Sequence, residues 1–228
     1  MINYGLAPAD DEIEITLFGP GYGEAIAIHL GENQWMLVDS CIDPFSNEPA
    51  SATYLQSIGV TPDRVLAIIA SHWHDDHVRG ISSLATRYAQ AEFSISVVLN
   101  EREARAFLAA YGGGAAPAQT GGTAELFKVI STRDPVYFVL HRSNVLEVQA
   151  SGRTVRVTAF SPLPAAVAQS VAHFAEYVAV DAGPIGHAPE LKPNKEAVAL
   201  HIDLGDDAIL LGSDLEEHAT HGWSAVAA

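Results

Sequence analysis

Runs of apolar residues that stop at polar turns dominate the first part of the chain. Apolar positions at residues 13–18 and again at 25–30 flank a glycine-rich turn, a pattern that predicts a β-hairpin. The runs at 35–38 and 65–70 are almost wholly apolar, as expected of strands that are buried on both faces. The sequence therefore predicts a sheet whose central strands end abruptly at polar residues.

Helical and strand patterns follow one another along the rest of the chain. We expect helices at residues 53–58, 101–111, 124–130 and 165–177, and strands at 94–99, 135–148 (as a pair), 154–160, 197–204 and 208–211. The last two strands flank the turn Gly205-Asp206-Asp207 and are predicted to form a hairpin. Because His201 alternates with the apolar positions of the first arm, we expect it to face water.

Composition places the chain among globular proteins. Apolar residues make up 48% of the chain and charged residues 18%, and its 228 residues can bury one sizeable core, so we interpret residues 1–228 as a single domain. No long apolar run and no secretory signal is evident, so we expect a cytoplasmic protein without a membrane segment. Cys41, the one cysteine, is expected to be a buried and inert thiol.

The charge of the chain restricts its partners. There are 28 acidic residues against 12 lysines and arginines, which gives a formal net charge of −16. A field of this sign repels long polyanions, and bound divalent cations would change it only locally. Long nucleic acids are therefore disfavoured, and we expect a small-molecule substrate or a short phosphodiester.

The strongest chemical signal follows the apolar run at 65–70. His72, His74, Asp76 and His77 lie within six residues of one another. On a tight loop, imidazoles two residues apart can converge on one divalent ion, while the neighbouring aspartate and histidine turn toward a second ion. The alternative is a solvated loop rich in histidine and aspartate, although unpartnered histidines seldom cluster in this way. Zinc suits these donors best, and manganese or iron would accept them too.

The cluster resembles the H-x-H-x-D-H signature of the metallo-β-lactamase superfamily, which stands here as His72-Trp73-His74-Asp75-Asp76-His77. Leu37-Val38-Asp39 is similar to the first motif of that family, and residues 209–214 are similar to its fourth. The resemblance extends from about residue 13 to 217 and implies an α/β fold, the αββα sandwich. By this resemblance Asp39 would accept a hydrogen bond that orients the histidine loop, with a simple strand-end cap as the alternative.

The resemblance also implies the roles of the metal ligands. His72 and His74 would bind a first metal ion, Asp76 and His77 a second, and Asp214 would bridge the two. Asp76 and Asp214 would then be the catalytic carboxylates. The implied cofactor is a pair of Zn²⁺ ions, and the implied reaction is hydrolysis by a hydroxide held between them.

Two ligands that are usual in the family have no clear counterpart. For a third histidine at the first metal the candidates are His141, His173 and His187. We favour His187 for its position, with a solvated loop histidine as the alternative. The family's last histidine is missing, because His218 and His221 follow Asp214 too closely. The chain therefore looks truncated at its C-terminus, or its metal site is reduced to one ion. A sheet edge uncovered by truncation would favour a homo-oligomer.

A narrower similarity concerns the substrate. Residues 193–200 and the following hairpin are similar to the hydrolase domain of bacterial DNA-uptake channel proteins, which is expected to cut phosphodiester bonds. Other branches of the superfamily cleave lactams, thioesters and lactones. We therefore expect a metal-dependent hydrolase of a phosphodiester or of a small ester, thioester or lactone. The alternative is a metal-binding or interaction protein whose degenerate site no longer hydrolyses.

Overall fold

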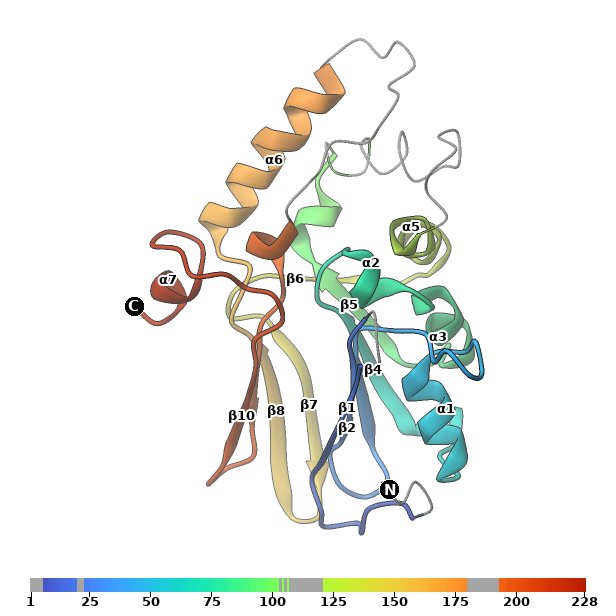
Figure 1. The fold of residues 1–228 in the computed structure, drawn as a ribbon. Coiled ribbons are helices and arrows are strands. Elements are labelled where there is room, and N and C mark those ends of the chain that lie inside the picture. Colours follow the sequence, from blue (N-terminus) through green and yellow to red (C-terminus); the bar gives the residue numbers. More distant parts are fainter. Residues whose placement is uncertain (1–5, 20–22, 103, 105, 107–120, 180–192) are drawn as a thin grey trace.

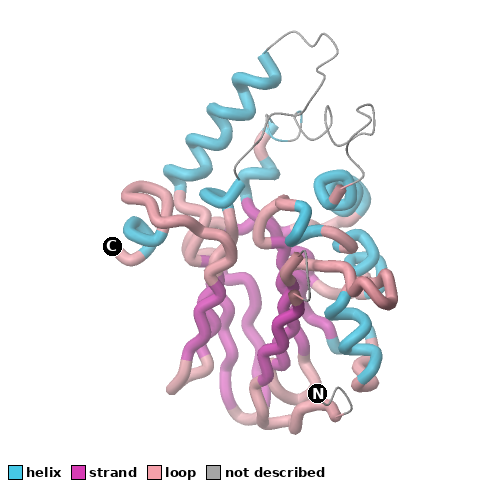
Figure 2. Tube along the Cα trace, in the orientation of Figure 1, coloured by secondary structure: helices cyan, strands magenta, loops and turns pink. Residues whose placement is uncertain are grey.

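Two β-sheets packed face to face form the centre of the protein (Figure 1). The computed structural model describes residues 6–19, 23–102, 104, 106, 121–179 and 193–228. Helices cover the outer face of the first sheet, and further helices lie beside and above the second (Figure 2). This arrangement confirms the predicted α/β sandwich.

The first sheet has the strand order β1-β2-β3-β4-β5-β6. Its strands are β1 (Glu14–Phe18), β2 (Ala25–His29), β3 (Trp35–Val38), β4 (Val65–Ala70), β5 (Glu92–Ser96) and β6 (Tyr137–Val139). The pairs β1·β2 and β2·β3 are antiparallel, whereas β3 to β6 run parallel to one another. The carboxyl ends of β3 and β4 therefore meet at the same edge of the sheet.

The second sheet has the order β10-β9-β8-β7 and is antiparallel throughout. Its strands are β7 (Asn144–Ala150), β8 (Arg153–Ala159), β9 (Leu200–Asp203) and β10 (Ala208–Leu211). In β9, buried Leu200 and Ile202 alternate with half-buried His201 and Asp203, which is the period expected of a strand with one covered face.

The helical segments vary widely in length. They are α1 (Ala50–Ser57), η1 (Pro62–Arg64), α2 (Asp75–Val78), α3 (Ile81–Arg87), η2 (Val97–Asn100), α5 (Gly122–Thr132), α6 (Pro164–Ala179), η3 (Pro193–Glu196) and α7 (Trp223–Val226). Helices α1, α3 and α5 bury apolar residues against the first sheet in one core. Among the described residues, no helix is long and apolar enough to cross a membrane.

A second core fills the space between the sheets. Ile28 and Met36 of the first sheet pack there with Val157 and Ile202 of the second. The strands β2, β3 and β4 are buried on both faces, because one face meets the helices and the other meets the second sheet. This double burial explains their nearly continuous apolar sequences.

Three sequence-based expectations need correction. The strand expected at 94–99 is the earlier β5, and its second half forms the turn η2 that packs against α6. The strands expected as a pair at 135–148 are β6 and β7, which join different sheets because the chain crosses between the layers at this point. His201 only partly faces water, since its ring is half-buried and stacks on Phe160 at a centroid distance of 5.0 Å. Most of the helix expected at 101–111 lies outside the described residues.

Candidate metal centre

Three chain segments bring polar side chains to one edge of the sandwich. Asp39 directly follows β3, the histidine loop follows β4, and Asp214 follows β10 of the second sheet. Polar ligands at the ends of buried strands are the usual arrangement in sheet proteins whose helices lie outside. The site therefore joins residues from both sheets.

The backbone turns sharply at the points where these side chains enter the site. Asp39 has φ 61° and Ser213 has φ 47°, both in the left-handed region that few residues with a side chain adopt. Gly23 has φ 115°, and a Cβ there would lie 2.8 Å from the Asp76 carbonyl oxygen. The next residue, Glu24, donates its N–H to that same oxygen at 2.8 Å. Residues 23 and 24, which lead into β2, are thus fixed against α2.

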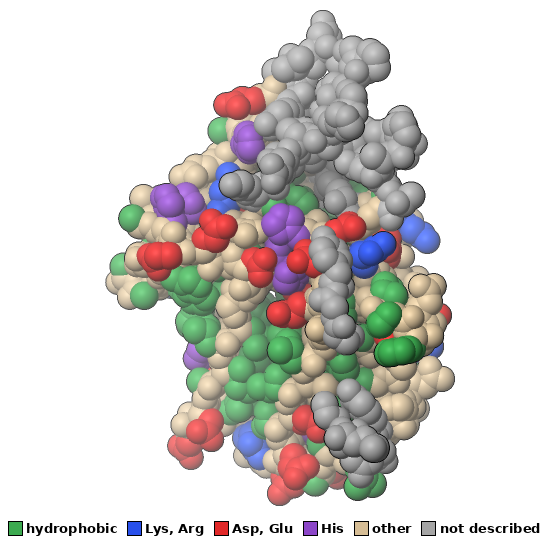
Figure 3. Space-filling view, viewed as in Figure 1, with side chains coloured by type: hydrophobic (Ala, Val, Ile, Leu, Met, Phe, Trp, Pro, Cys, Tyr) green, Lys and Arg blue, Asp and Glu red, His purple; other side chains and the backbone are tan. Residues whose placement is uncertain are grey.

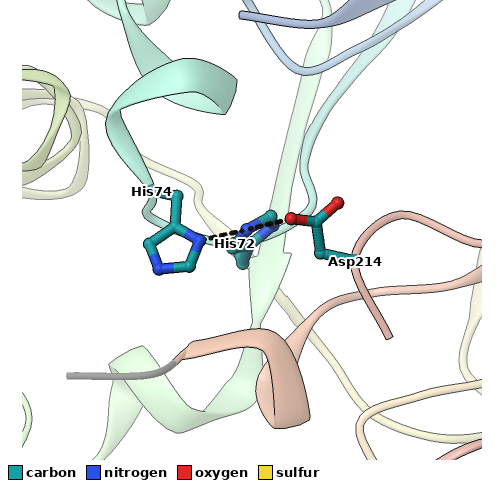
Figure 4. A group of neighbouring side chains, drawn as sticks. All are labelled: His72, His74 and Asp214. Carbon is teal, nitrogen blue, oxygen red and sulfur yellow. Dashed lines mark hydrogen bonds and ion pairs between the residues drawn. The ribbon is translucent and has the colours of Figure 1, made fainter. Parts of the chain in front are cut away.

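His72, His74 and Asp214 form a compact group of ligand atoms (Figure 4). One nitrogen or oxygen from each lies within 4.8 Å of the others. His72 Nε2 is 3.0 Å from His74 Nδ1 and 3.8 Å from Asp214 Oδ2. Ligand atoms around a tetrahedral zinc ion, each about 2.1 Å from the metal, are about 3.4 Å apart. The spacing and the donor types therefore fit a divalent ion such as Zn²⁺.

His77 approaches Asp214 from the other side. Its Nε2 is 3.6 Å from Asp214 Oδ1 and 4.0 Å from Asp76 Oδ2. The structure thus brings together all five residues that the sequence suggested as ligands. Their roles at a metal stay predictions.

Asp39 is buried behind the histidines and accepts three hydrogen bonds. Ser71 donates its N–H at 2.6 Å and its hydroxyl at 2.7 Å, and His77 donates from Nδ1 at 2.9 Å. The Ser71 hydroxyl is also 3.0 Å from His72 Nδ1. Because that hydroxyl donates to Asp39, it accepts from His72. Both histidines are therefore held through Nδ1, which leaves each Nε2 facing Asp214.

The Ser71 hydroxyl is a part of this site that the sequence reasoning missed. Ser71 is fully buried between β4 and the histidine loop. A polar residue at the end of an apolar run, just before His72, was the available signal. Ser213 adds a second hydroxyl 3.4 Å from His72 Nδ1.

Burial and neighbouring charges act differently on the two histidines. Burial lowers the pKa of His72 to about 2, and the charges of His77 and His74 act in the same direction. Burial also lowers the pKa of His77, but the hydrogen bond and charge of Asp39, with smaller contributions from Asp214 and Asp76, outweigh it and raise the pKa to about 9. His72 is therefore neutral and ready to bind a cation, whereas His77 carries a proton that a cation would displace.

The neighbouring Asp75 faces away from this group. Its carboxylate accepts the N–H of Gly122 at the start of α5 and lies 3.9 Å from the Arg79 guanidinium. Trp73 also points away and packs on Phe174 of α6 with ring centroids 5.7 Å apart. The six residues of the signature thus divide into ligand candidates and residues that anchor the loop.

None of the described histidines that the sequence suggested as further ligands lies in the group of His72, His74 and Asp214. His187 lies outside the described residues. His141 Nδ1 is 2.7 Å from the Phe160 carbonyl oxygen, and His173 is half-buried on α6. His218 and His221 stack on each other at 3.5 Å. On the face seen in Figure 3, histidine side chains lie near the centre and acidic side chains flank them.

Comparison with known proteins agrees with this geometry. The family model described as the metallo-beta-lactamase superfamily matches residues 18–222. A comparison with curated proteins gave no match.

Three solved structures illustrate the similarity. Metallo-beta-lactamase SMB-1 bound to 2-mercaptoethanesulfonate is 16% identical, with 69% of this chain and 53% of that chain covered and a TM-score of 0.41. A metallo-beta-lactamase from Cronobacter sakazakii is 17% identical, with 86% of this chain and 57% of that chain covered and a TM-score of 0.43. The MIM-2 metallo-beta-lactamase is 17% identical, with 91% of this chain and 61% of that chain covered and a TM-score of 0.42. This chain therefore spans little more than half the length of these proteins. On the family match over most of its length, the chain belongs to the metallo-β-lactamase superfamily.

Proposed function

We propose that the protein is a metal-dependent hydrolase with two ions, most simply Zn²⁺, at the His72 cluster. One observation carries this proposal. The two oxygens of Asp214 face different histidines, with Oδ2 3.8 Å from His72 and Oδ1 3.6 Å from His77. A carboxylate in this position can bridge two cations, one held with His72 and His74 and the other with His77 and Asp76.

The protein's own residues prepare the site for hydrolysis. Asp39 and Ser71 fix the rings of His72 and His77 and direct each Nε2 toward Asp214, so the donors need little reorganisation. When bound, divalent ions would polarise the carbonyl or phosphoryl oxygen of a substrate and stabilise the charge that develops on it. The acidic side chains around the site disfavour long polyanions.

The proposed substrates are small esters, thioesters and lactones, together with short phosphodiesters. The similarity of residues 193–200 to the hydrolase domain of DNA-uptake channel proteins supports the phosphodiesters, whereas the net charge of −16 supports a small substrate. A panel containing one member of each class distinguishes them.

The test compares two neighbouring aspartates. Asp76→Asn removes a proposed ligand, whereas Asp75→Asn alters a carboxylate that faces α5 and leaves an amide oxygen to accept from Gly122. We expect about two equivalents of zinc and hydrolysis of at least one panel member in the wild type and in Asp75→Asn. Asp76→Asn should lose one equivalent and most of the turnover. Equal turnover in the two variants would refute the proposal.

The alternative is a metal-binding protein that no longer hydrolyses. It is favoured by the lack of a further histidine beside His72, His74 and His77 in the described part of the site. Tight binding of a single zinc ion, with no turnover of any panel member, would support this alternative.

A further inference from the structure

The N-terminal part of the chain carries only negative charge. No lysine or arginine occurs before Arg64. The acidic residues in this stretch are Asp10, Asp11, Glu12, Glu14, Glu24, Glu32, Asp39, Asp43, Glu48 and Asp63. The stretch builds β1, β2, β3 and α1, so these elements and their connections contain carboxylates but no lysine or arginine.

Strand β1 lies at the free edge of the first sheet. Among the described strands it pairs only with β2, so the backbone N–H and C=O groups on its other edge have no strand partner. Ile15 and Leu17 are 44% and 64% exposed on this strand. Natural proteins usually protect such an edge with charges, proline or a covering segment, because an exposed apolar edge readily accepts another strand.

The register of β1 shows where these two apolar side chains point. Ile15 lies opposite Ile28, and Leu17 lies opposite Ile26. Directly opposed residues of an antiparallel pair share a face, and both partners belong to the core between the sheets. Ile15 and Leu17 thus extend this core at its open side, where Figure 3 shows hydrophobic side chains between the positions of β10 and β1.

A groove adjoins β1 at the end that carries Leu17 and Phe18. A cavity of about 600 Å³ lies between β1 and α1, and its lining includes Leu17, Phe18, Asp43, Phe45 and Tyr54. The rings of Phe18 and Tyr54 pack at 5.6 Å, and the Tyr54 hydroxyl donates to Glu14. Phe45 is 97% exposed. A volume of this size is typical of ligand pockets, and the lining includes a carboxylate but no basic side chain.

We propose that the free edge of β1 binds an extended segment of a partner protein, with an apolar centre and basic residues at both ends. The segment adds a strand to the first sheet. Alternate side chains of the added strand cover Ile15 and Leu17 on one face and fill the groove beside Phe45 on the other. Its basic ends meet the carboxylates of residues 10–12 at one end of β1 and Asp43 at the other.

Charge identifies this occupant among the alternatives. A second copy of this chain would bring two strongly acidic surfaces into contact, and nucleic acids or anionic lipids would be repelled for the same reason. A basic segment is attracted, and the main-chain hydrogen bonds of strand addition give it a defined register. Two cations lie beside this stretch, since Arg153 donates to the backbone oxygen of Asp11 and Arg87 to the side chain of Gln56, but the ten acidic residues before Arg64 outnumber them.

The binding test uses a synthetic peptide with a Val-Thr-Val-Thr-Val centre and two lysines at each end. Its affinity for the full chain is measured by fluorescence anisotropy, and its position by backbone amide shifts of the labelled protein. We expect saturable binding with the largest shifts in β1. Leu17→Ser and Phe45→Ser should each weaken binding about tenfold, as expected of apolar residues central to an interface. Leu210→Ser, a change at an exposed leucine of β10, should leave the affinity unchanged.

Two control peptides separate strand addition from simple charge attraction. A peptide of the same charge with proline at its centre cannot complete the strand, and one with glutamates in place of the lysines lacks the attraction. Both should bind at least tenfold more weakly than the first peptide. Equal binding of the proline peptide, equal loss in Leu210→Ser, or largest shifts away from both β1 and the groove beside Phe45 would overturn the proposal. Self-association of the free chain through β1, seen in the same shifts at rising concentration, would overturn it in favour of a second copy.

Discussion

Glu196 offers a direct test of the electrostatic reasoning, because a carboxyl group is buried there without a full set of partners. It ends η3, is 3% exposed, and its Oε2 has no hydrogen-bond partner. Burial raises the pKa of Glu196 from 4.5 to about 8, although the nearby Ser170 hydroxyl and the charge of Lys195 act in the opposite direction. The folded protein therefore holds this group protonated at pH 7, whereas the unfolded chain ionises it.

The sign and size of the effect follow from proton linkage. Since the folded state binds one more proton between pH 4.5 and about 8, the contribution of Glu196 to stability is complete below pH 4.5 and is lost as the pH rises to 8. Each pH unit costs about 1.4 kcal/mol, which amounts to about 3 kcal/mol at pH 7 and about 5 kcal/mol above pH 8. Replacing Glu196 by glutamine keeps the shape of the side chain and removes this loss.

The assay is urea unfolding of metal-free wild type and Glu196→Gln at pH 5, 7 and 8.5. We expect the two proteins to be nearly equal at pH 5, and the variant to be more stable by about 3 kcal/mol at pH 7 and by more at pH 8.5. Glu176→Gln, at an exposed glutamate on α6, should show no such trend. A difference between wild type and Glu196→Gln that does not change with pH would refute the reasoning.

Three further predictions follow from the site. Asp39→Asn should weaken zinc binding by about 10- to 100-fold in competition with a chelator, because the residue fixes both histidine rings; unchanged affinity would contradict this. Gly23→Ala should destabilise the protein by about 1–3 kcal/mol in urea unfolding, since the added Cβ meets the Asp76 carbonyl oxygen at 2.8 Å and φ is positive; a neutral effect would contradict the close packing. Cys41 should resist alkylation at pH 8 until the chain unfolds, because burial raises its pKa to about 11; rapid labelling of the folded protein would contradict this.

The sequence predicted those parts of the fold that depend on local periodicity. A short stretch of sequence is enough to recognise β3 and β4, because a continuous apolar run indicates a strand buried on both faces. The hairpin of β9 and β10 is recognisable from the turn between its two arms. It did not predict that β6 and β7 join different sheets, because the choice of partner strand depends on contacts far along the chain. The turn η2 was expected as strand because its residues are apolar, and they are apolar because they pack beside both β6 and α6.

The same division holds at the candidate site. The spacing of His72, His74 and Asp76 was visible in six residues, and Asp214 was found through the likeness of residues 209–214 to a family motif. Only the resemblance to the family signature singled out Asp76 over the adjacent Asp75, because the direction of each side chain is set by α2 and its contact with α5. The hydroxyl of Ser71 was missed because a single serine carries no pattern.

The candidate ligands come from both layers of the sandwich, with His72 following β4 and Asp214 following β10. Close to the same point, the N–H of Val198, on the segment leading into β9, donates to the carbonyl of Ser71 at 2.9 Å. Shear between the two sheets would have to separate these groups. Ligation of one ion by His72 and Asp214 would act as a removable cross-link between the layers, much as a disulfide would, and chelators would lower the melting temperature by mass action.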